Sequence, residues 1–190
     1  KQDTAKRNEA IKKAIADRDE QYKKAAIKAQ RIFNDSKPCS DHPYLKRKDV
    51  SACFGLRVSS QGRLVVPVFN CNDEKLQSIQ WIDDDGTKRF MPDGKMKDGC
   101  FIIGELERGK KAYLCEGLAT GLTIREATST PVIVAFNAGN LKSVYDAFKK
   151  EVSIIICADH DQHGKGEQAA IDCGGEYIMP PEIGDFNDLG

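Results

Sequence analysis

Three acidic residues in this sequence directly follow apolar runs that have the character of buried strands. Glu116 follows residues 112–115, and Asp159 and Asp161 follow the isoleucine-rich residues 152–158. In an open parallel sheet, ligands bind beyond the carboxyl ends of the strands. If both runs lie in one such sheet, the three carboxylates meet at one edge, where a divalent cation would offset their repulsion. The sequence therefore predicts a cation site at that edge.

Each acidic motif also has a simpler interpretation. A lone Glu-Gly pair is common, so an ordinary turn is the alternative for Glu116-Gly117. Asp159-His160-Asp161 is more specific, because aspartates at i and i+2 after a strand can direct two oxygen ligands to one Mg²⁺. His160 and His163 leave open a transition-metal site, with ordinary loop residues as the alternative.

The elements that must position these acids alternate between strand-like and helix-like patterns. Such alternation favours a parallel sheet covered by helices. The expected strands are residues 111–116, 132–136, 152–158 and 176–179. The expected helices are residues 120–127, 141–150 and 166–173, with Asn140 as the N-cap of the second.

The chain before residue 106 has a different character. Apolar spacing predicts one long helix over residues 3–34, followed by a basic linker that either is simply solvated or contacts nucleic acid. Residues 51–105 predict a small, mostly antiparallel subdomain. Its expected strands are residues 55–59, 63–69, 76–82, 88–90 and 100–103. Its basic residues Lys88, Arg89, Lys95 and Lys97 either reach phosphates or protect strand edges from aggregation.

Composition narrows the class of protein. The 190 residues carry no net charge, but residues 1–50 hold 14 Lys and Arg against 8 Asp and Glu, which suits a polyanionic substrate. The seven cysteines form no C-x-x-C pair, and no signal peptide or long apolar run occurs. We therefore expect a cytoplasmic protein without a membrane partner. The start at Lys1 rather than Met suggests a piece of a longer chain.

Glu-Gly after a first strand and Asp-x-Asp after a third resemble the Toprim domain of primases, topoisomerases and some nucleases. The segments CEGLATGLTIREATSTPVIVAFNAGNL, IICADHDQHGKGEQAA and GDFNDLG are similar to the Toprim primases of plasmids, phages and integrative elements. HPYLKRKDV, GRLVVPVFN and LQSIQWIDDDGTKRFMPDGKMKDGCFIIGE resemble the same group, so the likeness covers residues 42–190. His160 departs from the small residue that is common between the two aspartates.

The resemblance implies an α/β fold with a Toprim-type, Rossmann-like parallel sheet flanked by helices. It implies three parts: residues 1–50, the antiparallel subdomain 51–105 and the Toprim domain 106–190. Glu116 would be general base or metal-coupling carboxylate, and Asp159 and Asp161 would be Mg²⁺ or Mn²⁺ ligands, joined by Asp185 and Asp188. The residues expected to bind nucleotide or DNA are Arg63, Lys88, Arg89, Lys95, Lys97, Gly117, Asn140 and Lys165.

The function that the resemblance implies is metal-dependent synthesis of RNA primers on single-stranded DNA. Ribonucleoside triphosphates would be substrates, and a fused or associated helicase is a further expected partner. The active site is expected in a groove between the two halves. Two alternatives remain: a Toprim nuclease or topoisomerase fragment, and a non-catalytic nucleic-acid-binding module. The zinc module of full-length primases is missing, since Cys39-x-x-His42 is at most half of one.

Overall fold

The computed structural model describes residues 2–189 of the chain. The helices are α1 (Gln2–Asp35), α2 (Pro43–Arg47), α3 (Leu118–Thr128), α4 (Ala138–Phe148), α5 (Lys165–Cys173) and the 3₁₀ helix η1 (Phe186–Leu189). The strands before residue 106 are β1 (Lys37–Pro38), β2 (Arg57–Val58), β3 (Leu64–Asn70), β4 (Leu76–Ile82), β5 (Lys88–Phe90) and β6 (Gly99–Ile103). The remaining strands are β7 (Lys111–Cys115), β8 (Val132–Val134), β9 (Ser153–Cys157) and β10 (Glu176–Ile178).

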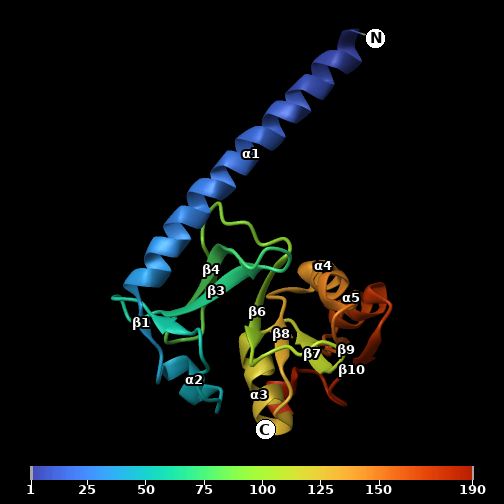
Figure 1. Ribbon diagram of the computed structural model, residues 1–190. Coiled ribbons are helices and arrows are strands. Elements are labelled where there is room, and N and C mark those ends of the chain that lie inside the picture. Colours follow the sequence, from blue (N-terminus) through green and yellow to red (C-terminus); the bar gives the residue numbers. More distant parts are fainter. Residues whose placement is uncertain (1, 190) are drawn as a thin grey trace.

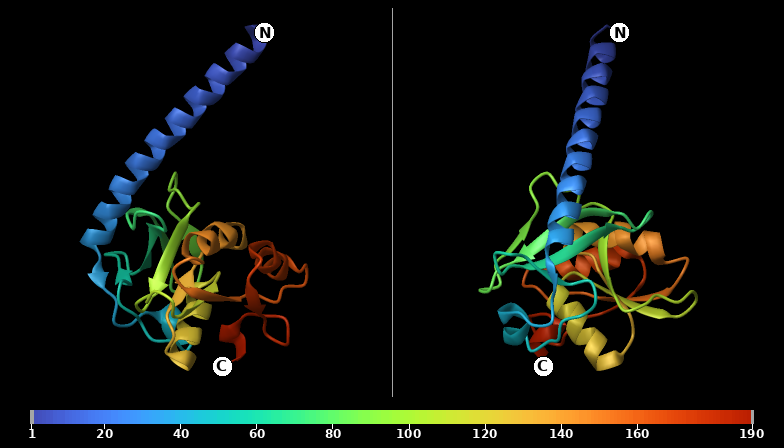
Figure 2. Two further views of the ribbon diagram at one scale, coloured as in Figure 1. Left: turned by 45° about the vertical axis from the view of Figure 1, so that its right-hand side comes forward. Right: turned by 60° about the vertical axis from the view of Figure 1, so that its left-hand side comes forward.

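The predicted long helix is confirmed as α1, which projects away from the rest of the molecule (Figure 1) and does so in every view (Figure 2). Its final third packs on β4 through the buried Ala25 and Ala29. The same helical face continues toward the N-terminus, where Ile11 and Ile15 are exposed. No helix within residues 2–189 is both long enough and apolar enough to cross a membrane.

The antiparallel half is built around β3, which pairs with β4 along one edge. On its other edge β3 pairs with β2 near its start and with β6 near its end. Pro67 lies between those two pairings and has no amide hydrogen to offer a neighbour. The edge of β3 is therefore open in its middle, and an apolar cavity lies there.

Strand β6 joins the two halves into one ten-stranded sheet. Its first residues pair with β3, and residues 101–103 pair antiparallel with β8. Beyond β8 the strands are parallel, in the order β8-β7-β9-β10. The predicted α/β architecture with a mostly parallel, helix-covered sheet is therefore confirmed.

The parallel half is covered on both faces. Leu118 and Leu122 of α3 pack with Val132 and Val134 on one face. Helices α4 and α5 pack on the other face through residues such as Leu141 and Ala170. This two-sided burial explains why the strands read as continuous apolar runs. The predicted N-cap was wrong: α4 begins at Ala138 with Asn137 as N-cap, so Asn140 lies inside its first turn.

Candidate metal and nucleotide site

Glu116 and Asp159 lie at the carboxyl ends of adjacent parallel strands. Strands β7 and β9 pair directly, with Cys115 opposite Cys157, so the acids follow at the same sheet edge. Glu116 is half-buried and accepts the backbone N–H of Ala138, at the start of α4. Burial, with repulsion from Asp159, raises the pKa of Glu116 to about 7. The predicted meeting of these two acids is confirmed.

Asp159 is the acid with the least compensation for its charge. Its Oδ1 is buried and has no hydrogen-bond partner among the described residues. Burial, followed by repulsion from Asp185, raises the pKa of Asp159 to about 6, although Lys88 acts in the opposite direction. Gly166 makes this arrangement possible, because a Cβ there would lie 2.3 Å from the Asp159 carbonyl oxygen. Helix α5 can therefore begin directly against the Asp159 backbone.

Asp185 reaches the site through a short backbone pairing. The His160 N–H donates to Gly184 O at 2.9 Å, and the Gly184 N–H donates back to His160 O at 3.0 Å. In this antiparallel bridge, the residue before His160 lies opposite the residue after Gly184, so Asp159 faces Asp185. The C-terminal acidic motif is thereby held beside the Asp-His-Asp loop.

Asn187 and Asp188 anchor that C-terminal motif. The Asn187 amide donates to the Lys48 carbonyl at 2.7 Å and to Thr123 Oγ1 at 2.9 Å. Asp188 Oδ2 accepts the Asp185 N–H at 3.0 Å, and its other oxygen lies 3.6 Å from Lys48 Nζ. Asp188 is therefore partly engaged in holding its own loop. Asp185 is engaged there too, because its Oδ1 accepts the Asn187 N–H at 2.7 Å, but its carboxylate also repels Asp159.

Asp161 has a different environment from the other acids. Its Oδ1 accepts the His163 N–H at 2.9 Å, and its Oδ2 accepts the Gly166 N–H at 2.7 Å. These backbone donors, with Gly166 the strongest, hold the pKa of Asp161 below its usual value. Asp161 thus satisfies amides at the start of α5, where the N-cap Gly164 has no side chain to do so.

Lys88 of β5 is a cation of the antiparallel half that lies within electrostatic range of the acids, although it forms no ion pair with them among residues 2–189. It lies at the surface of β5, yet its Nζ stands 5.9 Å from the centre of the buried Tyr44 ring. Removal from water lowers the pKa of Lys88, and the carboxylates of Asp185 and Asp159 oppose that shift. The antiparallel half therefore contributes a cation, Lys88, whose charge acts on Asp159 and Asp185 of the parallel half.

Tyr44 and Lys48 were not among the predicted site residues. Both belong to the segment HPYLKRK, whose cluster of basic residues was the available signal. His42 caps α2 there by accepting the Tyr44 N–H at 3.2 Å on Nδ1. Tyr44 is 2% exposed, and its hydroxyl has no partner within the described part of the chain.

Several predicted nucleotide-binding residues have other contacts in the structure. On β5, Arg89 alternates with Lys88 and pairs with Asp83 at 2.8 Å. Arg63 lies 5.2 Å from the ring of Trp81, which is opposite Arg89 in the β4–β5 register. Arg63 and Arg89 therefore lie on the sheet face away from Lys88.

Five residues of that predicted set remain, and four of them are placed as follows. Lys95 pairs with Asp98 at 3.4 Å, Lys97 is exposed, and Lys165 is the exposed first residue of α5. Gly117 is the N-cap of α3, where a Cβ would lie 3.3 Å from Thr120 Oγ1. Among residues 2–189, Lys95, Lys97 and Gly117 form no ion pair or hydrogen bond with the five acids, whereas the backbone N–H of Lys165 donates to the Asp161 carboxylate.

Asn140 is a structural residue rather than an open ligand. Its side chain is buried and donates to the Gly99 carbonyl at 2.7 Å and to the Ala135 carbonyl at 2.9 Å. Its oxygen accepts the Asp98 N–H at 2.9 Å. The amide therefore ties α4 to β6 and to the end of β8, and these bonds use its donors internally.

The acidic cluster fits a divalent cation by its chemistry. Repulsion acts between Glu116 and Asp159 and between Asp159 and Asp185, and a cation would offset it; the buried Asp159 Oδ1 also has no hydrogen-bond partner among residues 2–189. Within residues 2–189, however, no three His, Cys, Asp or Glu side chains lie together in a way that could hold a metal ion. His160 does not join the acids by its Nδ1, which lies 3.1 Å from the Pro180 carbonyl oxygen.

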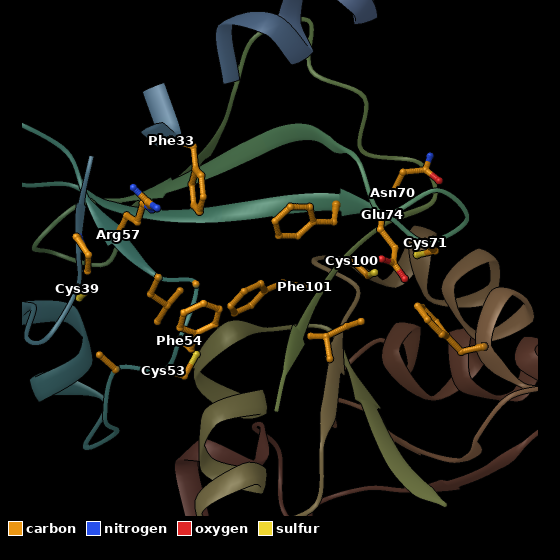
Figure 3. A pocket seen from close by; sticks show the side chains of 17 residues that line it. Phe33, Cys39, Cys53, Phe54, Arg57, Asn70, Cys71, Glu74, Cys100 and Phe101 are labelled. Atoms are coloured by element: carbon orange, nitrogen blue, oxygen red, sulfur yellow. The ribbon is translucent and has the colours of Figure 1, made fainter. Parts of the chain in front are cut away.

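An apolar cavity lies apart from the acids. It has a volume of about 640 Å³ and lies at the open edge of β3, between the loop leading into β2 and strand β6. Phe54 and Phe101 lie next to each other along its lining, and Cys71 and Cys100 lie at its other end (Figure 3). None of the five acids lines this cavity, so it is not the predicted active-site groove.

The comparisons with known proteins agree with this arrangement. Residues 111–189 match the model of the Toprim domain. A DNA primase TraC from Escherichia coli is 30% identical over 195 residues, covering 90% of this chain and 18% of that protein. A second DNA primase TraC from Escherichia coli is 32% identical over 157 residues, covering 73% of this chain and 11% of that protein. The chain thus spans less than a fifth of these relatives.

Two solved structures share the fold over most of the chain. The primase fragment of the bacteriophage T7 primase-helicase protein matches with a TM-score of 0.62 and 19% identity, covering 83% of this chain and 72% of that one. A DnaG primase catalytic domain bound to single-stranded DNA matches with a TM-score of 0.63 and 10% identity, covering 90% of this chain and 75% of that one. Residues 111–189 are therefore similar to the Toprim domain, and most of the chain shares its fold with these two structures.

Proposed function

We propose that this chain is the catalytic core of a DNA primase that makes RNA primers on single-stranded DNA from ribonucleoside triphosphates. One observation carries the proposal: Glu116 and Asp159 lie at the carboxyl ends of adjacent parallel strands, Asp185 lies opposite Asp159, and Lys88 of the antiparallel half lies within electrostatic range of both aspartates. The likeness to DNA primases named TraC supports this function over other Toprim activities.

Primer synthesis joins a 3′-hydroxyl to the α-phosphorus of a triphosphate and releases pyrophosphate. Glu116, whose pKa is raised to about 7, is suited to accept the proton of that hydroxyl near neutral pH. Lys88 is suited to pair with the triphosphate, whose negative charge exceeds that of the neighbouring acids. Asp161 keeps the start of α5 in place and so fixes the Asp-His-Asp loop.

Asp159 and Asp185, with Asp188 and Asp161 beside them, would hold Mg²⁺ or Mn²⁺. When bound, such a cation supplies positive charge that stabilises the in-line displacement and the leaving pyrophosphate. We further propose a cytoplasmic setting and a partner helicase, the latter because the T7 relative is a primase-helicase protein.

The test is to incubate the chain with single-stranded DNA, labelled ribonucleotides and Mg²⁺ or Mn²⁺. Short labelled oligomers that disappear with Asp159→Ala, but persist with Asp172→Ala, would support primer synthesis. Asp172 is a matched control because it is an exposed acid on α5 that contacts Gln168. Degradation of the DNA would instead indicate a nuclease. DNA binding that is unaffected by chelator and by Asp159→Ala would indicate a binding module.

A further inference from the structure

Phe136 adopts a backbone conformation that a bulky side chain rarely takes. Its φ is +70°, and it lies two residues beyond the end of β8, which pairs with the strand that Glu116 follows. Within residues 2–189, the other non-glycine residues with positive φ are Asp49, Glu74, Asp93, Asp98 and Ser129, which are all polar. Polar turn residues tolerate this region, whereas an aromatic residue there is strained. Something must therefore favour an aromatic ring at this point.

The Phe136 ring meets the ring of Phe90 from the antiparallel half. The two centroids are 6.1 Å apart and the planes cross at 81°, an edge-to-face pair. Phe90 is 36% exposed and Phe136 is half-buried, so the pair is not sealed within the core. Two partly open rings thus lie where the two halves meet.

The ring pair belongs to the same edge as the acids. Phe90 and Lys88 are two residues apart on β5 and share one face of that strand. Lys88 lies within electrostatic range of Asp159 and Asp185, which follow β9 and β10, and Phe90 contacts Phe136 beyond the end of β8. Strand β7 lies between β8 and β9 and carries Glu116. A phosphate bound near Lys88 would therefore lie on one side of Glu116, and the two aromatic rings would lie on the other side.

We infer that Phe136 and Phe90 form a stacking site for a nucleobase, either of the incoming ribonucleotide or of the single-stranded template. The inference deepens the proposed function and rests on it for the identity of the ligand. Stacking on aromatic rings is tolerant of sequence because every base has a π-face. The rings would hold the base while the charged groups contact its phosphates.

The test compares ligands with and without a base. Binding of ATP and of ribose 5-triphosphate is measured by calorimetry with Mg²⁺ and no template, beside a short oligonucleotide and its abasic analogue. For Phe136→Ala we expect roughly 5- to 100-fold weaker binding of a base-containing ligand. Its base-free counterpart should bind as in the wild type. If the loss appears between ATP and ribose 5-triphosphate, the base of the incoming nucleotide stacks on the rings. If it appears between the oligonucleotide and its abasic analogue, a base of the template does. Phe54→Ala is the matched control, since that ring is fully exposed and lies in the separate cavity.

A second pair of variants separates stacking from structural strain. Phe136→Gly removes the ring but accepts positive φ, so its melting temperature should exceed that of Phe136→Ala while its base affinity stays equally weak. Phe90→Leu keeps apolar bulk on an unstrained strand and should also lose base affinity. The inference is overturned if these variants bind base-containing ligands as tightly as the wild type, or lose affinity equally for base-free ones. A chain that binds bases through these rings yet makes no primer would contradict the proposed function alone.

Discussion

Asp159 and Asp185 lie opposite each other, one residue beyond the backbone bridge between His160 and Gly184. Asp159→Asn should therefore relieve repulsion at the site, and Asp185→Asn should lower the pKa of Asp159 from about 6 toward its ordinary value. Carbon-13 NMR titration of the side-chain carboxyl measures this shift. Asp172→Asn is the control, and an unchanged Asp159 titration in Asp185→Asn would show that the two acids do not interact.

Stability in the absence of metal should fall as pH rises from 5 to 8. Folding raises the pKa of Glu116 to about 7 and of Asp159 to about 6, so the folded state binds more protons than the unfolded state in this interval. By linkage the free energy of unfolding then decreases with pH, by about 2 kcal/mol after allowance for solvent screening. The depressed pKa of Asp161 acts only at lower pH.

Mg²⁺ should reverse that loss, because binding to the ionised acids stabilises the folded state. Thermal unfolding at pH 5 and pH 8, with chelator and with Mg²⁺, measures both effects. In Glu116→Gln/Asp159→Asn the pH slope and the Mg²⁺ response should both diminish. A wild-type melting temperature that is higher at pH 8 than at pH 5 in chelator would contradict the sign.

Lys88→Ala and Arg89→Ala should differ although the residues are adjacent. Lys88 faces the acids and Arg89 pairs with Asp83 on the other face of β5. We expect Lys88→Ala to raise KM for ribonucleotide by about tenfold or more, the effect of one lost charge-assisted hydrogen bond of about 1.5–3 kcal/mol. Arg89→Ala should stay within about twofold of the wild type. Equal changes in KM for the two variants in a primer-synthesis assay would show that Lys88 and Arg89 do not differ in their access to the ribonucleotide.

Tyr44→Phe should leave the fold intact and raise the free energy of unfolding by about 1 kcal/mol. The hydroxyl is buried without a hydrogen-bond partner in residues 2–189, and its removal ends an uncompensated loss of hydration. Urea denaturation measures the change. Tyr44→Leu is the informative comparison, because it also removes the ring that lies under Lys88 and Arg47. Destabilisation by Tyr44→Phe would mean that the hydroxyl has a partner in solution.

Asp161→Ala should lower the free energy of unfolding by about 1 kcal/mol, as for a lost N-terminal cap. The reason is that the Gly166 and His163 amides would lose their acceptor. Asp161→Asn retains an acceptor oxygen and should lose less. Equal stability of wild type and Asp161→Ala in urea would contradict the capping role.

The strands and the strand-end acids could be predicted from sequence because their signals are local. An isoleucine-rich run ending in Asp159 specifies a buried strand and the place where its acid emerges. Asp185 required a resemblance, since the backbone bridge that brings it to Asp159 joins segments separated by a helix and a strand. Local patterns cannot supply such a pairing.

The predictions that failed did so for the same reason, because local sequence does not show which distant residues a side chain contacts. Asn140 resembles a cap in its local sequence, but its amide bonds to Gly99, 41 residues away. Period-two alternation implies that Lys88 and Arg89 face opposite sides, yet only the packing of the two halves decides which side meets the acids. Phe136 gave no signal in the sequence, because its importance lies in a backbone angle.

The pairing of strand β6 with both halves of the sheet limits how far the two halves can move relative to each other. It is hydrogen-bonded to β3 at one end and to β8 at the other, so the half with Lys88 and the half with Asp159 share a strand rather than a hinge. Swinging the halves apart would break main-chain hydrogen bonds in the middle of the sheet. We expect substrates to enter and products to leave through rearrangement of side chains and loops, with the distance between the halves fixed once the chain has folded.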